Sequence, residues 1–206
     1  MRFPQRDVIG DFAARTFVGA LFVMLSFNLL NDFMRTGRIT GLLFLVSEAL
    51  VVVLTIVRRR ARVVDRSLYA AMLTGISLAG PPLMRAGGGE ALVPDLVTAI
   101  VSMVGTAIVI AGKVTIGRSF GIAPANRGIV ARGPYNVVRH PIYAGYLLTH
   151  AATLAAFPSW WNVAAVLAGD IALVLRALRE ERVLSADRAY RRYCGRVAWH
   201  LVPGLY

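Results

Sequence analysis

The sequence predicts an all-α fold: a polytopic membrane helical bundle of about six transmembrane helices, with a C-terminal helical hairpin and a cytoplasmic tail helix. Three observations predict it. The 206 residues are 57% hydrophobic and have a mean hydropathy of +0.61, whereas soluble domains hold about 45–50% apolar residues. The apolar residues also lie in long blocks, and most charges fall between those blocks.

The blocks define six expected helices. They are Thr16–Leu30, Ile39–Val57, Ser67–Met84, Leu96–Gly112, Ile142–Phe157 and Trp160–Leu175. A spanning helix needs about 20 residues, with a range of about 17–25. The second, third and fourth blocks qualify, and the first qualifies if Phe12 and Met34 are included. The last two blocks are shorter and are separated by Pro158-Ser159, which predicts a tight hairpin with Trp160 and Trp161 at the membrane interface. Helices are expected because backbone polar groups in hydrocarbon must be paired internally.

The basic residues predict the orientation. Five arginines lie between Arg58 and Arg66, and this loop is expected to be cytoplasmic. Counting alternate loops from there places 20 of the 23 Lys and Arg residues inside, and only Arg35, Arg38 and Arg85 outside. We therefore expect an integral protein, of a bacterial inner membrane by its charge bias, with both termini cytoplasmic. This asymmetry explains the net charge of +12 without a nucleic-acid partner.

Two polar stretches remain outside the apolar blocks. The first, Lys113–Pro141, carries turn signals, and the second is the tail Arg176–Tyr206, whose part up to about Cys194 is expected to continue the sixth helix. We divide the chain into N-terminal helices, residues 1–112, and a core, residues 113–206. The single cysteine excludes an intrachain disulfide.

Three polar residues inside the apolar blocks need an explanation. Glu48, His150 and Asp170 lie within predicted helices, so each is expected to pair with another helix or to line a substrate channel. The three histidines of the chain do not have the spacing of metal ligands, so we expect no metal. They are His140, His150 and His200.

The most informative segment is Gly133–Gly145, GPYNVVRHPIYAG, which directly precedes and enters the fifth apolar block. The adjacent acids Glu180-Glu181 follow the sixth block. A hairpin brings its two cytoplasmic ends together, so Tyr135, Arg139, His140 and Tyr143 are expected to approach the two glutamates. Because successive helical residues point about 100° apart, only one glutamate needs to face a ligand, and the other is free to pair with an arginine.

These motifs resemble a known family. Gly-Pro-Tyr, Arg-His-Pro-x-Tyr-x-Gly, two short helices, Glu-Glu and Tyr-x-x-Tyr together look like the isoprenylcysteine carboxyl methyltransferases and the related phospholipid methyltransferase-like membrane proteins. Gly117-Arg118-Ser119-Phe120 fits the segment that precedes these motifs, and the resemblance covers about residues 113–206. The family often has Phe-Gly before Tyr-x-x-Tyr, whereas this chain has Ser185–Tyr190 without glycine there.

The resemblance implies a methyltransferase that uses S-adenosylmethionine and acts on a lipophilic or prenylated acceptor, with membrane lipid as its surroundings. It implies catalytic roles for Arg139, His140 and Glu180. The cofactor-binding residues it implies are Tyr135, Arg139, His140, Tyr143, Gly145, Glu180 and Glu181. The second alternative is a membrane oxidoreductase similar to the related sterol reductases, which look alike in this C-terminal core, use NADPH and have longer, ten-helix chains. A non-enzymatic membrane adaptor is the third alternative.

The implied cofactor agrees with the residue chemistry. Arg139 could bind its carboxylate, a glutamate could accept from its ammonium or ribose hydroxyls, and Tyr faces could stabilise its sulfonium. A carboxylate acceptor needs no general base, whereas an amine acceptor must lose a proton, to His140 or to a glutamate. The sequence leaves carboxylate, amine and thiol acceptors open, as it does the oligomeric state.

Overall fold

The computed structural model describes residues 49–84 and 90–205, together with scattered helical positions nearer the N-terminus. Those positions are Thr16, Gly19, Ala20, Val23, Ser26, Leu30 and Met34. The chain forms two compact units, Met1–Arg58 and Arg59–Tyr206. Residues 49–57 of the first unit are helical, as expected, but most of the first two apolar blocks, and Glu48, lie outside the described residues. The site lies in the second unit, which is described below.

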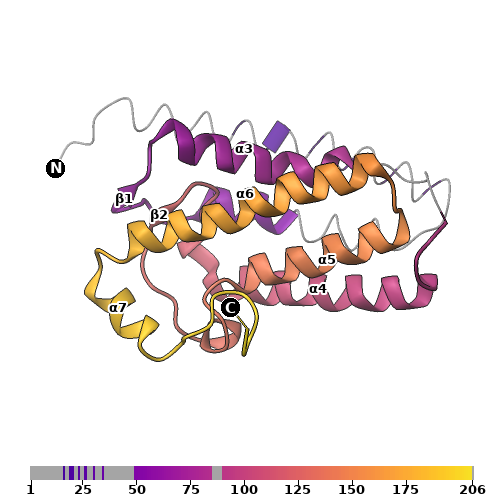
Figure 1. Cartoon of the computed structure of the whole chain (residues 1–206). Helices are drawn as coiled ribbons and strands as arrows, with labels where there is room; N and C mark the ends of the chain where they lie inside the picture. The colour runs from indigo at the N-terminus through magenta and orange to yellow at the C-terminus, as the bar shows by residue number, and fades with distance from the viewer. Residues whose placement is uncertain are drawn as a thin grey trace. The chain divides into compact units, whose positions relative to one another are not determined.

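Four long helices make up the body of the second unit (Figure 1). They are α3 (Leu68–Leu83), α4 (Asp95–Ile116), α5 (Pro141–Ala156) and α6 (Trp160–Leu184). Each begins within one residue of the block predicted for it, which confirms the helical reading of the last four blocks. In the structure, α3 and α4 pack with α5 and α6 in one compact unit. The division of the chain between residues 112 and 113 followed the family motifs and not the packing, and it remains a prediction.

Local signals fix where these helices begin and end. Pro141 occupies the first position of α5, where its missing N–H leaves no hydrogen bond unmade. The Ser159 hydroxyl accepts from the Asn162 N–H, at 3.1 Å, and caps α6. Gly117, with φ of +50°, ends α4 in a conformation that favours glycine, and its N–H bonds the Lys113 carbonyl.

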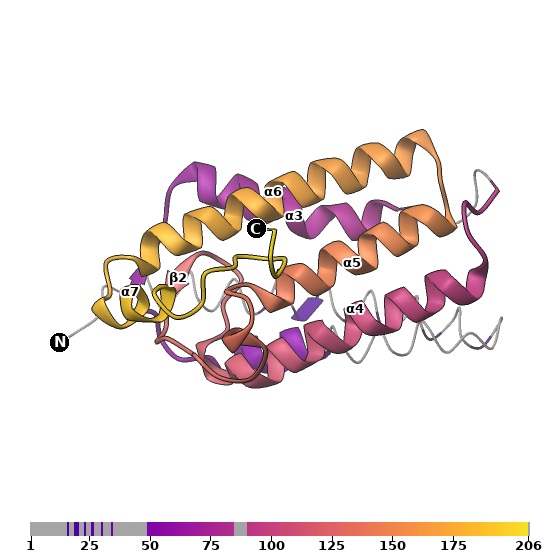
Figure 2. The ribbon, with the colours of Figure 1, turned by 60° about the horizontal axis from the view of Figure 1, so that its bottom comes forward.

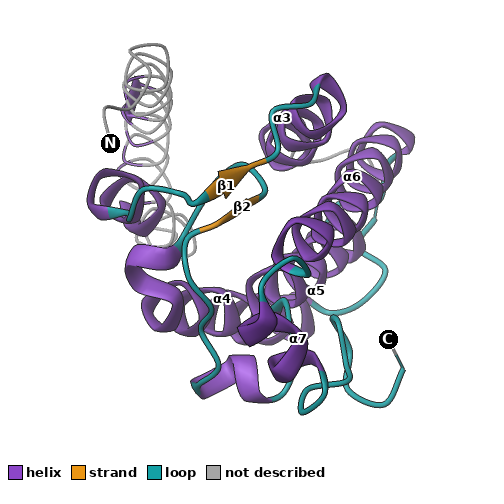
Figure 3. Ribbon diagram, turned by 90° about the vertical axis from the view of Figure 1, so that its left-hand side faces the viewer, coloured by secondary structure: helices purple, strands orange, loops and turns teal. Residues whose placement is uncertain are grey.

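The helices pack as two close pairs, α4 with α5 and α3 with α6 (Figure 3). Glycines make the close approach possible. A Cβ added to Gly145 of α5 would lie 2.6 Å from the Gly105 carbonyl oxygen of α4, and one added to Gly80 of α3 would lie 3.2 Å from the Cα of Gly169 in α6. The α5–α6 hairpin is therefore less tight than predicted, because each of its helices has its main partner elsewhere.

The segment before α3, the α4–α5 connection and the C-terminal tail gather at one end of the bundle (Figure 2). There β1 (Val63–Val64) pairs antiparallel with β2 (Ala125–Asn126), and this two-residue ladder is extended by the bond from the Arg62 N–H to the Asn126 carbonyl. Two short 3₁₀ helices, η1 (Gly117–Ser119) and η2 (Gly133–Asn136), lie in the same connection. The two basic loops expected on one side of a membrane thus meet at one end of the bundle.

The tail differs from the prediction. Helix α6 continues past the apolar block, as expected, but it ends at Leu184, and a separate helix α7 covers Arg188–Cys194. The reason is local: Asp187 has extended backbone, and its carboxylate accepts from the Ala189 N–H at 2.9 Å, which starts a new helix. The prediction of one continuous helix to Cys194 is therefore wrong after Leu184.

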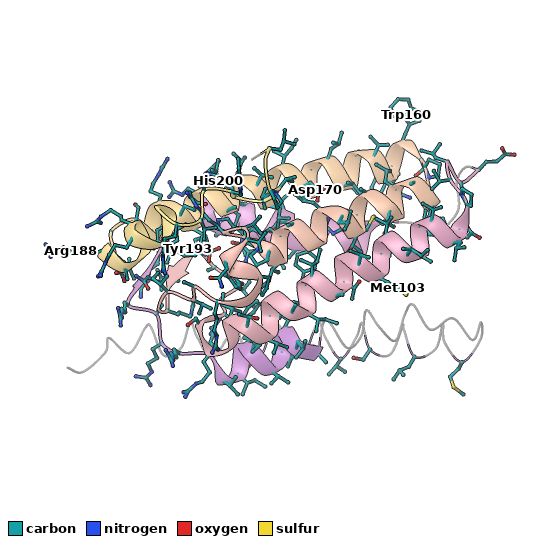
Figure 4. The ribbon with its side chains drawn as sticks, turned by 90° about the horizontal axis from the view of Figure 1, so that it is seen from below. Met103, Trp160, Asp170, Arg188, Tyr193 and His200 are labelled. Atoms are coloured by element: carbon teal, nitrogen blue, oxygen red, sulfur yellow. The ribbon has the colours of Figure 1, made fainter. Side chains whose placement is uncertain are left out.

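Two helical stretches of the described residues are long and apolar enough to cross a membrane, Asp95–Ser119 and Trp160–Leu184. The apolar part of α3, Leu68–Gly80, is shorter. Large apolar side chains project outward from α4, including Met103, which is 50% exposed and labelled in Figure 4. Such surfaces suit lipid better than water. The helical class is confirmed, with two very short strands added, and six spans remain a prediction.

Candidate functional site

The two motif regions meet at the polar end of the bundle. Tyr143, in the first turn of α5, donates its hydroxyl to Glu180 Oε2 at 2.9 Å. His140 Nε2 lies 2.9 Å from Glu181 Oε1, and Arg139 donates from a terminal guanidinium nitrogen to Glu181 Oε2 at 3.1 Å. The juxtaposition expected from the hairpin is confirmed by these three contacts, although about 40 residues separate the partners along the chain.

Glu181 is the centre of a crowded polar cluster. Besides Arg139 and His140, it bonds His200 of the tail, whose Nδ1 lies 2.7 Å from Oε1. An ionised carboxylate only accepts, so both histidines donate their N–H to it. His200 Nε2 lies 3.4 Å from a guanidinium nitrogen of Arg139. Glu181 has thus paired with an arginine, as one of the two glutamates was expected to do.

Glu180 has a sparser environment. Its bond to Tyr143 joins it to a stack in which the His140 and Tyr143 rings are nearly parallel, with centroids 5.3 Å apart. Over the Tyr143 ring lies the Arg176 guanidinium, 5.4 Å from the ring centroid. Arg176 is only 6% exposed and donates to the Ser77 hydroxyl at 3.4 Å, and its Nε has no hydrogen-bond partner among the residues that the structure describes. A buried guanidinium nitrogen left unbonded marks a place for an acceptor group.

The C-terminal tail closes the other side of the Glu181 cluster. The backbone N–H groups of Arg139 and His140 donate to the carbonyls of Trp199 and His200, each at 2.9 Å. Arg139 also donates from Nε to the Val197 carbonyl at 2.8 Å. Arg139 therefore holds the tail against the loop. The contact between Arg139 and a cofactor remains a prediction.

Buried tyrosines join the same tail to η2. The Tyr193 hydroxyl donates to the Tyr135 carbonyl at 2.7 Å. Burial raises the pKa of Tyr193 to about 12 and raises the pKa of Tyr135 well above its usual value, so both phenols stay protonated near neutral pH. Tyr190 and Tyr193 pack with Val197 in a small core. Tyr190 and Tyr193 thus have a packing role, even though the family's glycine is absent upstream.

Gly145 lies apart from the glutamates. It faces α4, where an added Cβ would also fall 2.7 Å from Val109 Cγ2. Close helix packing is thus a sufficient reason for glycine here, and its predicted cofactor contact stays a prediction.

Two residues of the site were given no role by the sequence. The first is Arg176, whose side chain contacts Ser77 and Tyr143. His200 was considered only as a metal ligand and rejected. The sequence does not show that His200 lies beside Glu181, because the chain turns back toward Glu181 only after α7.

Two of the polar residues within the apolar blocks pair between helices. His150 Nδ1 on α5 lies 2.6 Å from Asp170 Oδ1 on α6, which confirms the interhelical pairing expected for these two. In the described part of the chain, no set of three or more His, Cys, Asp or Glu side chains is arranged to hold a metal ion.

Part of the donor set matches the groups of S-adenosylmethionine. Glu180 could accept from its ammonium or ribose hydroxyls and Arg176 could donate to its carboxylate, whereas the Tyr143 ring is already stacked on His140 and covered by Arg176. When bound, this cofactor supplies an electrophilic methyl group.

Residues 96–191 match the family model for phospholipid methyltransferase. No curated protein matches the chain. The match spans α4, the loop with the Arg-His-Pro motif, the α5–α6 hairpin and the first part of α7. The family resemblance seen in the motifs is therefore confirmed over residues 96–191, a little under half of the chain.

Proposed function

We propose that this protein is an integral-membrane methyltransferase that uses S-adenosylmethionine to methylate a lipid acceptor at the cytoplasmic face. One observation carries the proposal: within the family region, Tyr143 and the Arg139-His140 pair bond directly to Glu180 and Glu181. The family match favours a phospholipid over an isoprenylcysteine as the acceptor.

The membrane arrangement supports this role. We propose six spanning helices with both termini cytoplasmic, as the charge asymmetry predicts. The polar end of the bundle carries the two basic loops and the tail, while the body exposes apolar side chains. A water-soluble cofactor would reach the cluster from the polar end, and a lipid acceptor would approach from the apolar side.

The residues have separate tasks in this proposal. Glu180 binds a cationic or hydroxyl group of the cofactor, and Arg176 binds its carboxylate through the unbonded Nε. Glu181, with Arg139, His140 and His200, fixes the loop and the tail around that pocket. Positioning is the main contribution expected of the protein, because methyl transfer to a nucleophile needs alignment of the two reactants.

The first test is calorimetric binding of S-adenosylmethionine to purified protein in nanodiscs. Glu180→Gln and Arg176→Lys should each weaken binding by about 10-fold or more, because each removes a charge-assisted hydrogen bond. Thr153→Val is the matched control, since its hydroxyl only bonds the Thr149 carbonyl within α5. Normal affinity in both site variants would place the cofactor elsewhere.

The second test is transfer of a radiolabelled methyl group to a total lipid extract, with prenyl-cysteine analogues in a parallel reaction. Label in the phospholipid fraction is the expected result. Tight NADPH binding without S-adenosylmethionine binding would favour a reductase, and binding of neither would favour an adaptor.

A further inference from the structure

A second polar group lies in the apolar body of the bundle, away from the Glu181 cluster. His150 on α5 is 7% exposed and bonds Asp170 on α6. Tyr146 stacks on the His150 ring with centroids 6.0 Å apart, and Lys113 of α4, fully buried, lies over the Tyr146 ring at 5.4 Å. Figure 4 shows Asp170 between Trp160, at one end of the molecule, and the tail residues at the other. Ionisable groups are costly in such surroundings, which points to a function.

The His150–Asp170 pair has a defined position relative to the proposed cofactor site. Tyr143 and His150 are seven residues apart, which is two helical turns, so they share one face of α5 about 10 Å apart along its axis. Both bond an acidic residue of α6. The pair lies on the apolar side of Tyr143, which is the side from which a lipid headgroup would approach.

The bonding pattern prepares the imidazole to accept a proton. The Asp170 carboxylate accepts from Nδ1–H, which fixes the tautomer and leaves the lone pair on Nε2. Within the residues that the structure describes, Asp170 is the side chain that hydrogen-bonds this ring. The neighbouring titratable groups are Asp170, Tyr146 and Lys113. The negative charge of Asp170 stabilises the imidazolium of His150 once it has formed. The positive charge of Lys113, which lies beyond Tyr146, favours the later release of the proton from that imidazolium.

We propose that His150, positioned by Asp170, is the proton acceptor for a lipid whose headgroup carries an amine. This inference rests on the proposed methyltransferase function. At neutral pH such an amine is an ammonium, which has no lone pair to attack a methyl group. The N–H bond breaks, its electron pair stays on nitrogen, and the proton moves to Nε2. The nitrogen pair then forms the new N–C bond as the methyl–sulfur bond breaks and sulfur keeps its electrons. The imidazolium returns its proton to water.

The proposal predicts a specific dependence on acceptor and pH. His150→Gln should lower the turnover number with an amine phospholipid by about 10²-fold to 10³-fold at pH 7. The loss should shrink at pH 10, where the free amine is abundant. Added imidazole should partly restore activity in His150→Gly. The affinity for S-adenosylmethionine should stay within twofold of the unmodified protein in all these variants.

A readout without turnover tests the positioning role of Asp170. In protein labelled with ¹⁵N-histidine, the ring shifts of His150 should report a proton on Nδ1, and Asp170→Asn should change that tautomer. Thr153→Val, one turn further along α5, is the control and should leave both spectrum and turnover unchanged.

Three outcomes would overturn the proposal: turnover unchanged in His150→Gln, an equal loss at pH 7 and pH 10 without imidazole rescue, or methyl transfer confined to carboxylate or thiol acceptors. The second outcome would leave His150 and Asp170 as a structural tie between α5 and α6. Failure of the unmodified protein to bind S-adenosylmethionine would instead refute the proposed function itself, and the calorimetry shows which of the two has failed.

Discussion

The polar end and the apolar body of the second unit are held together by different interactions. At the polar end, one carboxylate, Glu181, gathers an arginine and two histidines from the loop and the tail. In the body, the helices approach through glycines, as at Gly105 and Gly145. The difference follows from the surroundings, because charged groups are tolerated where water is near, whereas small residues give close packing where it is absent. The His150–Asp170 pair is an exception in the body, and therefore the part most in need of a functional reason.

The largest expected effect is at the polar end. Glu181→Gln leaves Arg139 and two histidines around a neutral side chain, and should destabilise the unit by about 3 kcal/mol. The Glu181 side chain is only 15% exposed, so water compensates little. Thermal unfolding in detergent measures the loss. Glu180→Gln is the comparison, with an expected cost of about 1 kcal/mol for its one bond to Tyr143. Equal losses in the two variants would contradict the division of roles between the glutamates.

In the body, Gly145→Ala should cost about 1–3 kcal/mol, because the new methyl group meets the Gly105 carbonyl and forces α4 and α5 apart. Gly75→Ala in α3 is the matched control, since nothing lies within 4 Å of its added Cβ. The control should be neutral or slightly stabilising. If both alanines are tolerated equally, the glycine contact is not what holds α4 to α5.

A smaller effect is expected at the tail. Tyr193→Phe removes the hydroxyl that donates to the buried Tyr135 carbonyl, and should cost about 1 kcal/mol. Tyr190 and Val197 still pack on the phenylalanine ring, so the tail should stay folded. Proteolysis of the C-terminal segment gives the readout. Release of the whole tail would show that this bond, and not the Glu181 cluster, holds it.

The smallest effect concerns the start of α7. Hydrogen bonds from the Ala189 N–H and the Asn126 amide, with the Arg62 charge 3.7 Å away, lower the pKa of Asp187 below its usual 3.8. A group with a lowered folded pKa stabilises the fold above its unfolded pKa, and this contribution disappears as pH falls through the folded value. The melting temperature of Asp187→Asn should therefore vary less than that of the unmodified protein below about pH 4. Parallel curves would contradict the shift.

The sequence by itself determined the helical class, the positions of α3 to α6 and the approach of Arg139, His140 and Tyr143 to the two glutamates. Apolar blocks, proline and glycine positions and a short hairpin are local signals, so they can be read along the chain. The sequence missed the break at Asp187, because a capping carboxylate within a charged stretch resembles an ordinary exposed helical residue.

Only the tertiary structure decided which partner each polar group takes. His200 reaches Glu181 after the chain turns back beyond α7, Arg176 lies over Tyr143, and His150 meets Asp170 across two helices. The pairing of α4 with α5 and of α3 with α6 was equally hidden. Such contacts depend on the rotation of each helix about its axis and on which helices are neighbours, and those are set by packing of the whole unit and not by any local pattern.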